Sequence, residues 1–181
     1  MMRAWIVGCL MLLAGCASHA PLPAGAPSLR LPLQLHVQRL QAGQSQDWML
    51  VIQREDDGLR WSLLDFLGIP QARQRLLGQQ WQADGLLPPN PEARELFAAV
   101  LFALTPAKQL MADYADATAT KGGRRLGDRW SVVYPPAPAR LLAAPTGAGA
   151  ARIDSADPEF TLYLQHDLTY RISPLPHEAT P

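Results

Sequence analysis

The thiol of Cys16 is the side chain with the clearest chemistry in this sequence, because two small residues, Ala14 and Gly15, stand directly before it. A basic start (residues 1–3) and an apolar run (residues 4–13) come first. This order is typical of an export signal with a small-residue cleavage site. The apolar run is too short to span a hydrocarbon core of ~30 Å as a permanent helix. We therefore predict that residues 1–15 are a signal peptide and are removed.

The four residues Leu13-Ala14-Gly15-Cys16 resemble a bacterial lipobox, in which a diacylglyceryl group is placed on the thiol and the signal is cut just before it. The resemblance implies that Cys16 is lipidated. One acyl chain holds a protein to a membrane only marginally, whereas two or more hold it stably. By resemblance to lipoprotein sorting in Gram-negative bacteria, the non-acidic Ala17 favours the periplasmic face of the outer membrane. The alternative is an ordinary signal peptide that contains a cysteine.

The remaining reactive side chains do not form a convergent set. The histidines of the mature chain are spread over an expected tether, a strand, a turn and the tail: His19, His36, His166 and His177. There is no Gly-x-Ser-x-Gly elbow, no His-Glu-x-x-His and no phosphate loop. The acidic pair before Gly58 fits a turn better than acid–base work. We predict no catalytic residue, no metal site and no cofactor.

Charge gives little indication of a partner. Of 181 residues, removal of 15 leaves 166, and loss of Arg3 leaves 15 basic side chains against 16 acidic ones. A chain with this balance of charges has no strong positive electrostatic field that would attract nucleic acid. Its length is typical of one domain. One basic group is compatible with anionic head groups, although a solvated hairpin is the favoured interpretation: Lys121, Arg124, Arg125 and Arg129.

The elements that position these side chains begin near Leu29, after a small, Pro-rich tether over residues 16–28. Period-two alternation predicts strands over residues 31–38, at an edge or starting at Pro32, and over residues 59–63. Further strands are expected over residues 46–54, which are rich in apolar side chains, and over residues 72–81. The triplet Asn90-Pro91-Glu92 is typical of a helix start, and the all-apolar run Leu96–Leu104 indicates a buried helix. A second helix is expected after Thr105-Pro106.

Strands return near the C-terminus, over residues 130–134, 160–165 and 168–173, with His166-Asp167 as a hairpin turn. A long loop is expected over residues 135–151. The order of the expected elements, with strands first, then helices and then strands again, predicts an α+β domain with helices on one face of an antiparallel sheet. The domain is expected to cover residues 29–175, followed by a tail over residues 176–181.

The order of elements from Leu29 to about Leu175 resembles the LolA/LolB superfamily, whose members are incomplete β-barrels closed on their concave face by helices. The local match is residues 59–68, which resemble the LolB strand that enters a protruding Asn-Pro-Leu-Gly-type loop. Leu67 takes the place of the leucine that enters the membrane during lipoprotein transfer. Asp65 and Phe66 stand where that family has asparagine and proline.

The whole pattern is similar to uncharacterised outer-membrane lipoproteins (a domain of unknown function) of aryl-polyene-type biosynthetic clusters. The resemblance implies an apolar cavity for a lipid or acyl-chain ligand and a LolA-like periplasmic carrier as a possible partner. Residues expected to line the cavity are Leu33, Leu35, Trp48, Leu50, Trp61, Leu63, Leu96 and Val100. The residues by themselves leave open whether these side chains line a cavity or form an ordinary core.

The segment Phe66–Pro70 supports the insertion role independently, because a loop between strands is normally exposed and polar, and this one is apolar. The alternative is that it packs beneath the helices.

The leading hypothesis is a non-enzymatic outer-membrane lipoprotein that accepts an acylated or polyene-type lipid and passes it into the membrane. The second is an adaptor lipoprotein without cargo, favoured by a fully packed interior. The third is an envelope acyl-ester hydrolase, which would need a buried Ser–His–Asp set.

Overall fold

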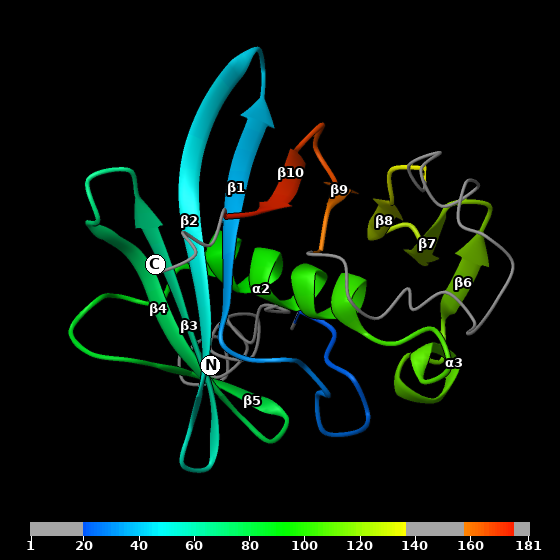
Figure 1. The fold of residues 1–181 in the computed structure, drawn as a ribbon, viewed down its shortest axis with the longest axis horizontal. Helices are drawn as coiled ribbons and strands as arrows, with labels where there is room; N and C mark the ends of the chain where they lie inside the picture. The colour runs from blue at the N-terminus through cyan, green and yellow to red at the C-terminus, as the bar shows by residue number, and fades with distance from the viewer. Residues whose placement is uncertain (1–19, 137–157, 176–181) are drawn as a thin grey trace, which may run out of the picture.

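The computed structural model describes residues 20–136 and 158–175, and one antiparallel sheet dominates this part of the chain (Figure 1). The ten strands there have the order β5-β4-β3-β2-β1-β10-β9-β8-β7-β6. Their bounds are β1 (Leu33–Gln41), β2 (Gln44–Glu55), β3 (Gly58–Asp65), β4 (Pro70–Leu77), β5 (Gln80–Ala83), β6 (Ala117–Thr120), β7 (Gly123–Leu126), β8 (Trp130–Val133), β9 (Phe160–Tyr163) and β10 (Thr169–Pro174). The sheet does not close, and β5 and β6 are its edges. This agrees with the predicted antiparallel sheet and is consistent with a partial β-barrel.

The alternation of apolar residues places one face of the sheet in the core. Leu35, Leu50, Leu63 and Ala72 lie opposite one another across β1 to β4, and each side chain is at most 1% exposed. The residues between them in sequence are partly exposed, as a half-buried strand requires. The predicted strands of this meander are therefore confirmed over most of their length.

Helix α2 (Pro91–Leu104) crosses the direction of β1 and β2 (Figure 1). The Asn90 side chain caps its first turn by accepting a hydrogen bond of 3.0 Å from the Ala93 backbone nitrogen. Every residue from Leu96 to Ala103 is buried. The helix packs against both halves of the sheet, since its aromatic side chains contact Trp61 of β3 and Trp130 of β8.

Two predictions about single elements are wrong, and one hairpin was not predicted. The strand expected over residues 72–81 is two strands, because Gly78 (φ +56°) turns the chain between β4 and β5. The second helix is only the single turn α3 (Leu110–Asp113), and Met111 is 62% exposed. Strands β6 and β7 were not predicted, because in them only the first and last residues of the hairpin, Ala117 and Leu126, are buried.

The N-terminal strap, defined here as residues 20–32, lies against the domain, where the sequence predicts a flexible tether up to residue 28. Ala20 and Pro23 are buried. The Gln79 side chain donates a hydrogen bond to the Pro23 carbonyl, and the backbone nitrogens of Ala24 and Gly25 donate to Asp113. Pro32 precedes β1, which lies in the middle of the sheet, so it marks a strand start and no edge.

Several predictions lie outside the described residues: the export signal, Cys16, most of the loop expected over residues 135–151, and the tail. Within the described ranges, no helix is long and apolar enough to cross a membrane. The turn at His166-Asp167 is confirmed, since both residues have positive φ (63° and 55°) and lie between the paired strands β9 and β10.

Candidate functional site

The loop between β3 and β4 is held in shape by the carboxylate of Asp65. Its Oδ1 atom accepts hydrogen bonds of 2.9 Å from the backbone nitrogens of Leu67 and Ile69. Its Oδ2 atom accepts one of 3.1 Å from the Gln71 side chain. Gly68 takes a φ of +80°, which a glycine adopts without steric cost. An aspartate that bonds to its own loop backbone in this way is a common turn device.

The side chains that this loop carries are apolar and exposed. Phe66 is 85% exposed, Leu67 71% and Ile69 53%. The alternative that the loop packs beneath the helices is therefore wrong. The register also shifts between Leu63 and Leu64, directly before the loop, and such bulges commonly re-aim a strand end. We call residues 65–69 the apolar loop.

The eight residues expected to line a cavity lie on the buried face of the sheet and on α2. Six of them are at most 1% exposed, whereas Leu33 and Trp48 are partly buried. Side chains of α2 fill the adjacent space, as the Trp61 and Phe97 ring centroids, 5.5 Å apart, indicate. Two hollows of the described structure, one beside the N-terminal strap and one between β1, β9 and β10, are lined by none of the eight.

Two glutamates in the first turns of α2 tie the helix to the sheet. Glu92 Oε1 accepts hydrogen bonds from Arg39 Nε (2.6 Å) and the Tyr170 hydroxyl (2.8 Å). Burial alone would raise the pKa of Glu92, but these two hydrogen bonds outweigh it and lower the pKa. Burial raises the pKa of the Tyr170 phenol, so Tyr170 remains a donor to Glu92 in neutral solution.

Glu95, one turn further along α2, binds the other half of the sheet. Its two oxygens accept hydrogen bonds of 2.6 Å from Arg129 Nε and Nη2, in a bidentate pair, and Oε1 also accepts one of 2.6 Å from Trp130 Nε1. The hydrogen bond to Glu95 raises the pKa of Arg129. Arg129 therefore fixes α2 to the β7–β8 turn and is not part of a solvated hairpin.

The C-terminal end of α2 is capped by a second residue of the same basic group. Arg124 Nη1 donates hydrogen bonds to the carbonyls of Phe102 (3.1 Å) and Thr105 (2.6 Å), which lie in the last turn and at the C-cap of the helix. The Tyr134 hydroxyl donates one to the Ala103 carbonyl, and burial raises the pKa of Tyr134 to about 12. The favoured interpretation of this group as a solvated hairpin is therefore wrong for Arg124 and Arg129, although Lys121 and Arg125 are exposed.

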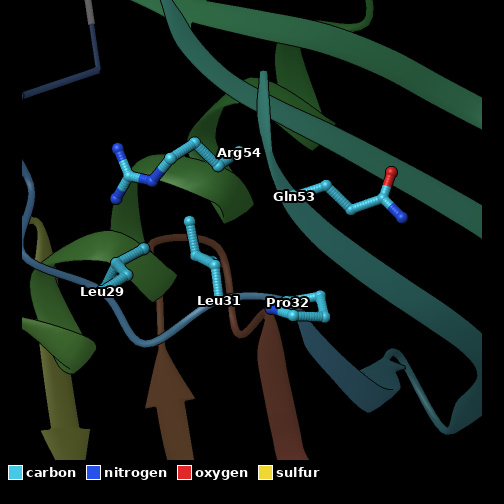
Figure 2. A pocket seen from close by; sticks show the side chains of 5 residues that line it. All are labelled: Leu29, Leu31, Pro32, Gln53 and Arg54. Carbon is cyan, nitrogen blue, oxygen red and sulfur yellow. The ribbon is translucent and has the colours of Figure 1, made fainter. Parts of the chain in front are cut away.

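A hollow of about 600 Å³ opens between the N-terminal strap and the end of β2 (Figure 2). Its lining consists of Leu29, Leu31, Pro32, Gln53 and Arg54. Arg54 extends to the same side of β2 as the strap leucines, and Gln53 points to the other side (Figure 2). No pattern in the sequence indicates this site, because its two sides are separated by more than twenty residues of chain.

The histidines show no shared site among the described residues. His36 lies on the polar face, as predicted, with Nε2 2.9 Å from Asp47 Oδ1, and His166 lies in its turn. His19 and His177 fall outside the description. Across residues 20–136 and 158–175, no three His, Cys, Asp or Glu side chains gather as metal ligands would. Comparison of the chain with models of known protein families and with curated proteins found no match.

Proposed function

We propose that this chain is an outer-membrane lipoprotein with a LolB-like half-barrel, which binds a lipid or acyl chain and releases it into the membrane. The observation that carries the proposal is the apolar loop, which exposes Phe66 and Leu67 on a backbone that Asp65 fixes. Each of these two side chains gains roughly 1.5–3 kcal/mol when it is buried in hydrocarbon. The loop is thus suited to enter a bilayer without a further folding step.

The position of the N-terminal strap constrains how the anchor and the loop reach one membrane. The strap contacts Gln79, just beyond the end of β4, whereas the apolar loop adjoins its start at Pro70. At ~3.4 Å per residue, these points are about 24 Å apart along β4. The seven residues from Cys16 to Pro23 reach about 25 Å at most. A fully extended tether therefore just spans the length of β4, so that anchor and loop can meet one bilayer even when β4 stands along the membrane normal.

A cargo in the interior requires α2 to move, because its side chains fill the space beneath the sheet. The helix is fixed by Glu92 and Glu95 at its start and by Arg124 at its end. An acyl chain that displaces Phe97 or Leu96 replaces one apolar contact by another, so the exchange needs no cofactor. Loading from a LolA-like carrier would proceed in this way, from weaker to tighter apolar burial.

The second candidate is an adaptor lipoprotein that supports an envelope assembly and holds no cargo. The tightly packed residues next to α2 favour it, since six of the eight expected lining residues are almost fully buried among neighbouring side chains. Under this proposal the apolar loop contacts a partner protein. The two candidates make opposite predictions for lipid content.

Native mass spectrometry of residues 17–181 purified from the periplasm, followed by lipid extraction, separates the candidates. A lipid bound in a ratio of one to one supports the carrier and identifies its cargo. A protein that is empty and also fails to bind an apolar fluorescent probe contradicts the carrier and favours the adaptor.

The release step is tested by Leu67→Glu, with Leu86→Glu as the control, because Leu86 is a fully exposed leucine that is not part of the apolar loop. We expect Leu67→Glu to retain a fluorescent acyl lipid and to lose its transfer to acceptor vesicles by tenfold or more, since roughly 1.5–3 kcal/mol of insertion is removed. Leu86→Glu should transfer normally. Normal transfer by both variants would contradict the insertion role.

A further inference from the structure

The hollow beside the N-terminal strap lies where the buried face of the sheet ends. Leu50 and Ile52 of β2 are buried, and Arg54 follows them on the same face, because alternate residues of a strand share a face. Its cross-strand neighbour, Leu59 of β3, is 5% exposed. A cationic side chain thus stands at the rim of an otherwise apolar surface.

The charge of Arg54 is not neutralised by its neighbours in the described residues. No carboxylate there lies within 4 Å of its guanidinium, whereas other arginines nearby have such partners. The adjacent Glu55 pairs with Arg60 and Arg75 on the opposite face. An exposed arginine beside apolar side chains, with its own acidic neighbour engaged elsewhere, can accept an anion in bidentate geometry.

The side of the hollow that the N-terminal strap forms is apolar. Leu29 and Leu31 pack against the core but remain partly exposed, and Pro32 closes the side next to β1 (Figure 2). The volume of about 600 Å³ falls within the range of pockets that hold small ligands. Ile52, which precedes Arg54 on the same face of β2, and Leu59, which lies opposite Arg54, are both buried in the core.

We propose that this hollow binds the head of a single-chain amphiphile whose head group is anionic. Arg54 pairs with a carboxylate or phosphate, and the first methylene groups of the tail lie against Leu29 and Leu31. The inference rests on the proposed lipid-carrying function and specifies that the head group of the cargo is negatively charged. A neutral amphiphile with the same tail binds more weakly, because it leaves the guanidinium without a partner.

The test is native mass spectrometry of the full lipoprotein, released from detergent micelles and titrated with palmitate, hexadecyl phosphate and hexadecanol. We compare Arg54→Ala with Arg30→Ala, which removes the same charge from an exposed residue between Leu29 and Leu31 that does not line the hollow. We expect Arg54→Ala to weaken the binding of the anionic probes about tenfold and to leave hexadecanol unchanged. Arg30→Ala should change neither.

The results separate failure of this inference from failure of the carrier proposal. Equal binding of palmitate and hexadecanol by the unaltered protein, or equal losses in the two arginine variants, overturns the head-group site and leaves the carrier intact. Absence of binding for all three probes overturns both. Tighter binding of hexadecyl phosphate than of palmitate assigns the head as a phosphate, the reverse assigns a carboxylate, and either supports the site.

Discussion

The carboxylate of Asp65 holds the backbone of Leu67, with Oδ1 2.9 Å from the Leu67 nitrogen. The same oxygen accepts a hydrogen bond from Ile69, so that one side chain orders the loop on which the exposed apolar residues stand. A loop that is ordered before it binds loses less entropy on binding. Asp65 is therefore a positioning residue for whatever Phe66 and Leu67 contact.

Replacement of Asp65 is expected to slow lipid transfer without a change in lipid binding. Asp65→Ala removes acceptors for two backbone donors, at a cost of about 1 kcal/mol to the ordered loop, or about fivefold in transfer rate. Asp65→Asn keeps one acceptor and should retain most of the rate. Vesicle transfer assays measure both variants. Asp56→Ala, which alters an exposed turn aspartate elsewhere, is the control; a loss there equal to that of Asp65→Ala would contradict the positioning role.

The hydrogen bonds of Glu92 to Arg39 and Tyr170 predict that the free energy of unfolding falls at acidic pH. The pKa of Glu92 is lowered in the folded chain, so its contribution is complete above the ordinary value of 4.5 and is lost as the pH falls through the lowered value. Glu92→Gln should unfold at lower urea concentration at pH 7, by about 1 kcal/mol because the side chain is 43% exposed. The gap from the unaltered protein should narrow as the pH falls below 4.5.

Urea midpoints at pH 7 and pH 3 test this expectation. Glu159→Gln serves as the control, because Glu159 is exposed and has no ion pair among the described residues; it should show no gap at either pH. Equal destabilisation of Glu92→Gln at both pH values would show that the carboxylate charge has no part in fixing α2.

The expected anchor is tested with the two cysteines of the chain. Cys16→Ala should abolish labelling by radioactive palmitate and remove the protein from the outer-membrane fraction, because no acyl acceptor remains. Cys9→Ala should be labelled and fractionate normally, since Cys9 lies within the predicted signal. If only the Cys9 variant lost its label, the acylated residue would be Cys9 and the prediction for Cys16 would be wrong.

Much of the sheet can be predicted because its signals are local. Leu33, Leu35 and Val37 alternate with polar neighbours in β1, and Asn90 caps the helix that it precedes. The exposure of Leu67 was also predictable, because no apolar period connects the loop to a core. The β6–β7 hairpin has no such period, so its strands depend on the neighbours with which they pair.

The contacts that fix the candidate site have no local signal. Glu92 contacts Arg39 and Tyr170, which are 53 and 78 residues away, and these pairs form only when the sheet brings β1 and β10 together. Arg54 and the strap leucines meet in the same way at the end of β2. A sequence pattern identifies such arginines as solvated charges, and only the tertiary arrangement shows that Arg124 caps a helix.

The attachment of the N-terminal strap yields the last prediction, which concerns the reach of the anchor. Asp113 holds the strap through two hydrogen bonds, from Ala24 to its carbonyl and from Gly25 to its Oδ1 atom. Asp113→Ala removes the second, so the segment around Gly25 should exchange its amide hydrogens about fivefold faster, as a loss of about 1 kcal/mol implies. Amide exchange of residues 33–41 should not change. Asp116→Ala, an exposed neighbour, is the control. Unchanged exchange in Asp113→Ala would show that Pro23 and the carbonyl contact hold the strap without the carboxylate, and that this side chain does not set the distance between anchor and apolar loop.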